Sequence, residues 1–153
     1  MLPTTGTIRV VTEATPDQLW AVLTAPERVG EWSHEARAGE WLRPFTGPSV
    51  GARFAGPSAS GRQRWTRIVE IVSYEPPATL AWRTIPRFPY RDSTSWTFRL
   101  RTVDGGTEIE QSYVLDAPRW WLRLLWFLVP AHRDRTMALT DDLRRLGEVA
   151  ARE

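Results

Sequence analysis

The sequence has no cysteine and no lysine, and all twenty of its basic residues are arginine. Without cysteine the chain forms no disulfide, performs no thiolate chemistry and builds no cysteine-based zinc site. Cysteine usage therefore does not indicate whether the protein works in an oxidising or a reducing compartment. Histidine is scarce as well, because only His34 and His132 occur. A histidine-rich metal site is therefore not expected, and we predict neither a metal nor a cofactor.

Long hydrophobic runs are missing too. The first residues, MLPTTG, show no charged region followed by an apolar stretch, so no signal peptide is predicted. The longest apolar run, Trp120–Pro130, is interrupted by Arg123 and is far shorter than the ~20 residues that a membrane-spanning helix needs. We expect a cytoplasmic protein without a transmembrane segment, in which this run is buried or interfacial.

Charges of the two signs nearly balance. The net charge is +2, so the high isoelectric point of about 9.6 reflects the basicity of arginine rather than a polycation. Binding to nucleic acid requires basic residues gathered on one face. Near the C-terminus basic and acidic residues alternate instead, which is typical of a solvated face: Arg133, Asp134, Arg135, Asp141, Asp142, Arg144 and Arg145. We expect no nucleic-acid partner.

The 153 residues fit a single domain, 1–153, that buries roughly two-thirds of the surface of the unfolded chain. No repeat or long linker divides it. Alternation of apolar and polar residues over Thr7–Ala14 predicts a strand. The next four residues, Thr15 to Gln18, supply an N-cap, a proline at the first helical position and a capping-box glutamine. We expect a helix to about Ala25 and a second short helical piece over Pro26–Trp32.

Six further stretches alternate as strands do, with turn residues between them. The expected turns are 46–49, 56–61, 75–77 and 104–106. The expected strands are Ala36–Leu42, Val50–Phe54, Gln63–Tyr74, Thr79–Ile85, Thr94–Val103 and Thr107–Asp116. The short connections favour an antiparallel meander over βαβ units, and hence an α+β fold.

The last two strands flank Asp104-Gly105, which is a strong hairpin signal. A two-residue turn there pairs Arg99 with Glu110 and Arg101 with Glu108 on one face. The other face then pairs Trp96 with Tyr113, Phe98 with Gln111 and Leu100 with Ile109. A three-residue loop would place Trp96 and Phe98 on the face of the two glutamates, so we predict the two-residue register.

In this register an amide and a phenol, Gln111 and Tyr113, face inward on an apolar stripe. Two interpretations remain open. They are buried polar groups satisfied by their neighbours, or they anchor a ligand in an internal pocket. Inward positions on two neighbouring strands mix aromatic and polar side chains in the same way: Trp65, Arg67, Trp82 and Thr84.

The C-terminal region has two helical parts. Residues 118–129 are apolar nearly all round, which predicts burial on more than one side. Pro130 is expected to kink or restart the helix. In the second part an apolar stripe recurs at helical spacing, through Leu139, Leu143, Leu146 and Ala150, and extends back to Thr136 and His132. Apolar packing thus gives way to polar groups toward the start of this part.

Four segments carry a resemblance to a known family: EATPDQLWAVLTAPERVGEWS resembles its first strand and helix pair, VGARF its third strand, IVEIVSYEPPATLAWRT its central hairpin and DGGTEIEQSY its last hairpin. The chain is similar, over about Thr7–Val149, to the START-like SRPBCC superfamily in its polyketide cyclase/dehydrase and lipid-transport-like group. The resemblance implies a helix-grip fold, in which a seven-stranded antiparallel sheet curves around a long C-terminal helix and a hydrophobic cavity. Two short helices follow the first strand.

The resemblance also implies binding or carriage of a hydrophobic or aromatic small molecule, lipid or polyketide-like, by a monomer or homodimer. A polyketide cyclase/dehydratase-like enzyme is the alternative, and a protein-interaction or regulatory module using Trp120–Phe127 is a third possibility. The expected ligand-binding residues are Trp32, Trp65, Trp82, Trp96, Phe98, Gln111, Tyr113, Phe127 and His132.

No G-x-S-x-G elbow or phosphate-binding glycine loop is present, which disfavours hydrolase and nucleotide chemistry. Cyclisation or dehydration instead needs one or two acid–base groups within reach of the substrate. The candidates are Tyr113, His34 and His132, although a solvated loop is the more common setting for a histidine like His34, and a helix start for one like His132. The acids Glu108 and Glu110 are expected to face solvent beside arginines. No buried carboxylate pair is expected.

Overall fold

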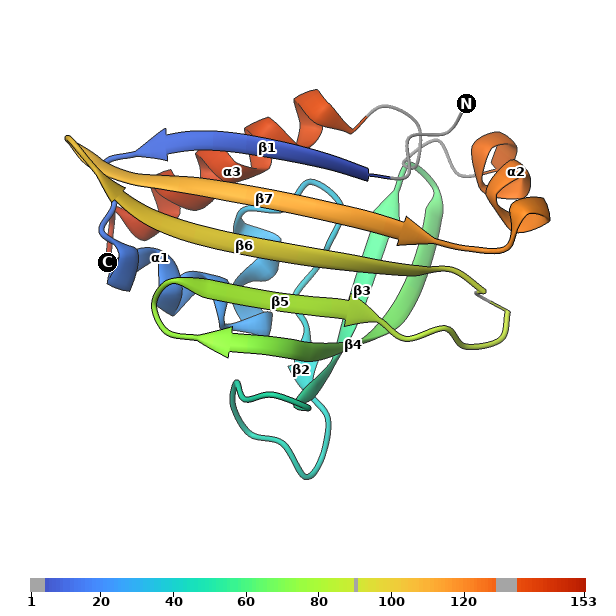
Figure 1. The fold of residues 1–153 in the computed structure, drawn as a ribbon. Coiled ribbons are helices and arrows are strands. Elements are labelled where there is room, and N and C mark those ends of the chain that lie inside the picture. Colours follow the sequence, from blue (N-terminus) through green and yellow to red (C-terminus); the bar gives the residue numbers. More distant parts are fainter. Residues whose placement is uncertain (1–4, 90, 129–134) are drawn as a thin grey trace.

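The computed structural model describes residues 5–89, 91–128 and 135–153, with the backbone alone for 122 and 125–128. The predicted antiparallel sheet of seven strands is confirmed, and the strand order is β1-β7-β6-β5-β4-β3-β2. The strands are β1 Thr5–Thr12, β2 Glu40–Trp41, β3 Arg53–Ser60, β4 Gln63–Glu75, β5 Thr79–Thr84, β6 Ser93–Val103 and β7 Gly106–Asp116. Figure 1 shows the sheet curving around α3, Thr136–Ala150.

Two short helices follow β1, as the sequence predicts. Helix α1, Pro16–Leu23, begins at a complete capping box in which the Thr15 hydroxyl accepts from the Gln18 backbone and the Gln18 side chain accepts from the Thr15 backbone. The 3₁₀ helix η1, Pro26–Glu31, begins at a proline directly after it. Together they carry the chain from the end of β1 across to the opening of the sheet.

The predicted register of the β6–β7 hairpin is confirmed. Arg99 pairs with Glu110 and Arg101 with Glu108, and the guanidinium–carboxylate distances are 3.3 and 3.0 Å. Both arginines are well exposed, so each ion pair adds little to stability. The opposite face of the hairpin carries Phe98, Ile109 and Gln111 into the interior, where all three are buried.

The core lies between this face of the sheet and α3. The predicted stripe on α3 is confirmed, since Leu139, Leu143, Leu146 and Ala150 are all buried. They pack with Leu19, Val22 and Leu23 of α1 and with apolar side chains of the sheet. The start of α3 is the more polar end, and there the space between helix and sheet is not closed by apolar side chains.

Two strand predictions were wrong around β3. The turn expected at 56–61 is strand as far as Ser60, because β3 pairs with β4 along its whole length and the chain reverses at Gly61 with a φ of +58°. Pro57 is tolerated because β2 pairs with β3 only at Phe54 and Ala55, so Pro57 lies outside that ladder, where isolated backbone contacts from residues 35–37 reach β3. The strand expected over 36–42 reduces to β2 and one bridge between Ala36 and Ser58.

The burial predicted for residues 118–129 was wrong for Trp120 and Leu124, while the side chains of 122 and 125–128 and the whole of residue 129 lie outside the described residues. Helix α2, Arg119–Leu128, lies beyond the end of β7 rather than in the curve of the sheet (Figure 1). No second layer covers its described outer side chains, so Trp120 is 60% exposed and Leu124 is 37% exposed. Helices α2 and α3 are separate elements, and Pro130 lies outside the described residues.

Candidate functional site

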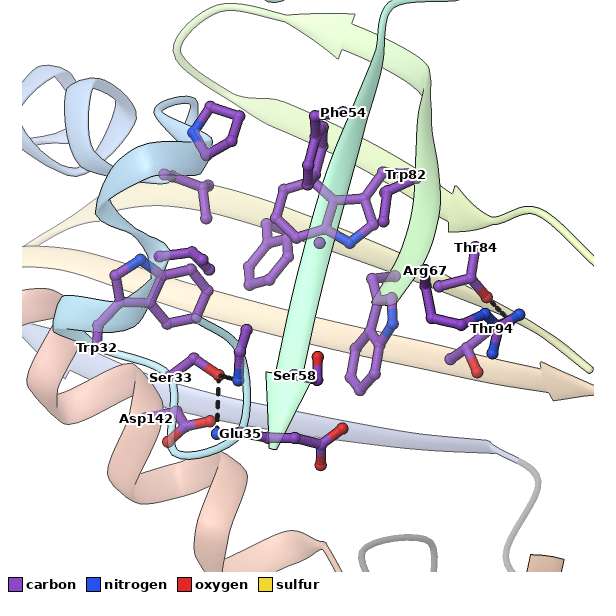
Figure 2. Close-up of a pocket in the computed structure, with 18 of the residues that line it drawn as sticks. Trp32, Ser33, Glu35, Phe54, Ser58, Arg67, Trp82, Thr84, Thr94 and Asp142 are labelled. Atoms are coloured by element: carbon purple, nitrogen blue, oxygen red, sulfur yellow. Dashed lines mark hydrogen bonds between the residues drawn. The ribbon is translucent and has the colours of Figure 1, made fainter. Parts of the chain in front are cut away.

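A pocket of about 170 Å³ lies where the concave face of the sheet meets η1 and the start of α3. Its walls are rich in aromatic side chains, which come from five strands and the segment after η1. The aromatic lining consists of Trp32, Trp41, Phe54, Trp65, Trp82, Trp96 and Phe98. Figure 2 shows Trp32 on one side of the pocket, facing the side chains of Phe54 and Trp82.

These rings support one another. Trp82 packs against Phe54 and Phe98 with ring centroids 5.9 and 5.0 Å apart, and Trp32 meets Phe98 edge-on at 6.2 Å. Such pairs each contribute ~0.5–1.5 kcal/mol beyond the burial of their surface. The wall is therefore preformed, as expected for a site that receives an apolar molecule.

One acceptor inside this wall has no partner. Gln111 is 4% exposed and lines the pocket, and its side-chain Oε1 has no hydrogen-bond partner within the described part of the chain. Leaving a buried polar atom unsatisfied costs ~1–3 kcal/mol. A ligand with a hydrogen-bond donor would satisfy this buried acceptor.

A histidine and a carboxylate join η1 to α3 at the pocket edge. His34 donates its backbone N–H to Oδ1 of Asp142 at 2.9 Å, and its Nδ1 lies 2.7 Å from Oδ2. Asp142 is buried and also accepts from Arg145, whose Nε donates to the carbonyl of Trp32. The hydrogen bond to Asp142 raises the pKa of His34, while partial burial of the ring opposes that rise.

A second carboxyl lies beside this pair. The Glu35 Oε2 is 3.8 Å from His34 Nε2, and burial raises the pKa of Glu35, against the attraction of Arg135 and His34. Arg135 lines the pocket and places its guanidinium 5.7 Å from the ring centroid of Trp96. Burial lowers the pKa of Arg135, which Glu35 and Tyr113 counteract. Proton-exchanging groups and a buried cation therefore share one side of the pocket.

The other polar end of the pocket lies on β4, β5 and β6. Arg67 donates to both carboxylate oxygens of Asp92 at 3.2 and 3.1 Å, and to the Asp92 carbonyl at 2.7 Å. Thr84 accepts from the backbone of Thr94 at 2.7 Å. In Figure 2 Arg67, Thr84 and Thr94 lie together, across the pocket from Trp32. This end is polar but internally satisfied.

The structure brings together most of the residues expected to bind a ligand. Of these, Trp32, Trp65, Trp82, Trp96, Phe98 and Gln111 line the pocket, and so does His34, which was predicted as a catalytic candidate. Tyr113 is buried with its ring against Gly6 and, at 5.3 Å between centroids, against Trp96; it is not among the lining residues, and its contact with a ligand stays a prediction. The side chain of Phe127 and the whole of His132 lie outside the described residues.

Sequence reasoning missed the two buried aspartates of the site. The mixed charge of the C-terminal region predicts a solvated face, yet Asp142 is 2% exposed; Asp92, in the segment before β6, is equally buried. One signal was available, because Asp142 is adjacent to Leu143 and three residues after Leu139 on the buried stripe. No comparable signal places His34 against Asp142, 108 residues away.

A metal is not supported by these side chains. No group of three or more histidine and carboxylate ligands comes together anywhere in the described ranges. No helix among the described residues is long and apolar enough to cross a membrane.

Comparison with known proteins agrees with this architecture. The family model described as polyketide cyclase / dehydrase and lipid transport matches residues 3–149. No curated protein sequence matches the chain. Among solved structures, a protein of Thermus thermophilus is similar with a TM-score of 0.72 and 11% identity, covering 97% of both chains. One from Rhodobacter sphaeroides has a TM-score of 0.67 and 23% identity, covering 98% of this chain and 94% of that one.

A third similar structure is the di-domain ARO/CYC StfQ from the steffimycin biosynthetic pathway. It has a TM-score of 0.72 and 9% identity, and the match covers 97% of this chain and 51% of StfQ. Identities this low indicate a shared fold and leave activity to be argued from the site itself. The helix-grip arrangement expected from the sequence is confirmed.

Proposed function

The chain belongs to the polyketide cyclase / dehydrase and lipid transport family, and on that premise we propose that its pocket binds a small hydrophobic or aromatic molecule that carries a hydrogen-bond donor. The observation that carries this proposal is the unsatisfied Oε1 of Gln111 in a pocket wall rich in aromatic side chains. A bound hydroxyl or N–H would remove the cost of that buried acceptor.

The size of the pocket limits the ligand. A volume of about 170 Å³ is close to the ~150 Å³ of an engineered apolar cavity that holds benzene. The part of a ligand enclosed here is therefore about one or two rings. A long lipid chain would have to extend beyond the pocket, so a compact aromatic portion suits the site better.

The first test is native mass spectrometry of the purified protein, to detect a co-purifying small molecule. The second compares 2-naphthol with naphthalene, two probes of nearly equal shape that differ by one hydroxyl. We expect 2-naphthol to raise the thermal unfolding midpoint more than naphthalene does, because its hydroxyl reaches Gln111. In the variant Gln111→Leu, binding of 2-naphthol should weaken by ~1–3 kcal/mol and binding of naphthalene should not.

Two controls make this test decisive. Ser95→Ala changes an exposed polar residue on β6, outside the pocket lining, and should leave both probes unaffected. Trp82→Ala removes part of the aromatic wall and should weaken both. Equal binding of 2-naphthol to the native protein and to Gln111→Leu would contradict the assignment of Gln111, and failure of both probes would contradict an aromatic ligand of this size.

A second candidate function is catalysis by proton transfer, in keeping with a cyclase or dehydratase. The observation that favours it is the pairing of His34 with buried Asp142, beside Glu35, at the pocket edge. Asp142 fixes the ring of His34 through Nδ1, which leaves Nε2 directed away from Asp142 and near Glu35. An orienting carboxylate, an imidazole and a second carboxyl are the groups that general acid–base catalysis uses.

This candidate is tested with 5-nitrobenzisoxazole, an aromatic probe that opens when a base removes its C3 proton and the N–O bond breaks to give a coloured phenolate. If the pocket catalyses proton transfer, the native protein should open the probe ~10²-fold faster than His34→Gln, the lower limit for a positioned acid–base group. Binding of 2-naphthol to His34→Gln should persist. Equal rates with equal binding would favour a carrier.

A further inference from the structure

Helix α2 presents two different faces to solvent. Trp120 and Leu124 lie one turn apart, so they share a face, and they are 60% and 37% exposed. Arg119 and Arg123 are also one turn apart and exposed, on the adjoining face. The described side chains therefore form an apolar stripe flanked by a cationic one, as in helices that lie flat on a membrane.

A hydrogen bond from Trp121 attaches α2 to a residue of the pocket wall. The indole of Trp121 donates to Oδ1 of Asp92 at 3.4 Å, and the same carboxylate accepts from Arg67 of the pocket. Trp120 and Trp121 pack edge-on with centroids 5.1 Å apart. One indole of this adjacent pair thus anchors the helix, while the other remains exposed.

The segment between β5 and β6 extends the same surface. Phe88 is 80% exposed, and the Arg91 guanidinium lies 5.9 Å from its ring centroid. This segment runs into Asp92, which accepts from Trp121, and the connection between β5 and β6 lies at the same end of the sheet as α2 (Figure 1). We define the α2 surface as Phe88, Arg91, Arg119, Trp120, Arg123 and Leu124.

The charge of the α2 surface is of one sign. Its three arginines are exposed, and α2 contains no acidic residue. The nearest exposed acid along the chain is Asp116, which ends β7 three residues before the helix. Exposed tryptophan, phenylalanine and leucine beside arginine match the boundary between acyl chains and anionic headgroups.

We propose that the α2 surface binds peripherally to lipid bilayers that contain anionic lipids. Trp120, Leu124 and Phe88 enter the headgroup boundary, and Arg119, Arg123 and Arg91 pair with lipid phosphates. The helix has ten residues and cannot span the bilayer, so it lies in the plane of the interface. An acidic protein or a second copy of the chain would require cation-binding groups arranged to match, whereas a fluid anionic surface adapts to these arginines.

Such binding bears on how the pocket is loaded, a consequence that rests on the proposed function. The Arg67–Asp92 end of the pocket is in direct contact with α2, because Asp92 accepts from both Arg67 and Trp121. Docking of the α2 surface would bring this end of the pocket to the bilayer, where a hydrophobic molecule is most concentrated.

The test is flotation of the full chain with vesicles of phosphatidylcholine alone or of equimolar phosphatidylcholine and phosphatidylglycerol. We expect the protein to float with the anionic vesicles and to be released by high salt. Arg119→Gln combined with Arg123→Gln should weaken binding by about 25-fold, at about fivefold for each arginine. Trp120→Ala should weaken binding to anionic vesicles as well.

The matched control is Arg99→Gln with Arg101→Gln. It removes the same net charge from exposed arginines near the β6–β7 turn, at the opposite end of the sheet (Figure 1). Binding should change by less than twofold. An equal loss in both double variants would show attraction by net charge alone and would overturn the proposal.

A second readout identifies the inserted face. Brominated phosphatidylcholine in the anionic vesicles should quench part of the tryptophan fluorescence of the native protein. Trp120→Phe should keep vesicle binding and lose much of the quenching. Unchanged quenching, or a dimer that depends on Trp120 without vesicle binding, would overturn the proposal. Gln111→Leu separates the two functions, since it should weaken binding of 2-naphthol and leave flotation unchanged.

Discussion

His34 binds both oxygens of the Asp142 carboxylate, one through its backbone N–H and the other through its ring Nδ1. The two residues are 108 positions apart in the chain. This contact fastens the segment after η1 to the first half of α3, beside the pocket. It makes the protonation state of one histidine a determinant of how firmly the pocket edge is held.

The first prediction concerns stability as a function of pH. Because Asp142 raises the pKa of His34 above its ordinary value of about 6.5, the folded state holds the proton more tightly than the unfolded chain does. The stabilisation by His34 is fully present below about pH 6.5 and is lost as the pH rises through the higher folded pKa. The difference in unfolding midpoint between the native protein and His34→Gln should therefore shrink as the pH rises.

Glu35 contributes with the same sign in a lower range of pH, because burial raises its pKa from a smaller ordinary value. The variant Glu35→Gln separates the two contributions. The His34 resonances in an NMR titration give its folded pKa directly, with His132→Gln to assign the second histidine. A pKa of His34 at or below the ordinary value would contradict the role given to Asp142, as would an Asp142→Asn variant with an unchanged titration.

The second prediction is that Gln111→Leu stabilises the empty protein. The change removes a buried acceptor without a partner in the described structure and nearly conserves volume. We expect a gain of ~1–3 kcal/mol in the free energy of unfolding, measured with urea in the absence of ligand. The sign is opposite to that of most core substitutions. A loss of stability would show that the amide is satisfied within the protein.

The third prediction concerns the ion pair between Arg67 and Asp92, whose side chains are 11% and 2% exposed. Replacing Asp92 with Asn leaves the buried guanidinium without its counter-charge, which should cost ~3–5 kcal/mol in urea unfolding. Glu110→Gln, at a half-buried surface carboxylate whose partners Arg9 and Arg99 are exposed, is the control and should cost less than ~1 kcal/mol. Combining Arg67→Met with Asp92→Leu should recover most of the loss, and comparable losses in all three would refute this account.

The fourth prediction tests the placement of Tyr113. A Cβ added at Gly6 would lie 2.6 Å from the Tyr113 ring, so Gly6→Ala forces that ring to move and should cost ~1–3 kcal/mol. In a Tyr113→Leu background, the same substitution should cost much less. The double-mutant cycle measures this coupling. Additive effects would mean that the ring does not cover Gly6, and would favour contact of Tyr113 with a ligand.

Local chemistry was sufficient to predict the elements whose signals lie close together in the chain. Thr15 and Gln18 specify the start of α1, and Asp104-Gly105 specifies the register of the last hairpin, because a one-residue shift would expose Trp96 and Phe98. The same alternation predicted that Gln111 faces inward. These features depend on residues that are neighbours along one helix or across one turn.

Tertiary structure decided the features that depend on contacts between distant segments. Whether α2 is buried depends on where the sheet ends, and its apolar composition alone could not reveal that Trp120 remains exposed. Asp142 and Asp92 are charged residues of ordinary appearance in the sequence. Their partners compensate for the loss of hydration: Arg67 for Asp92, and His34 together with Arg145 for Asp142. The sequence by itself determined the sheet, its register and its inward aromatic stripe; folding determined which charges those aromatics enclose.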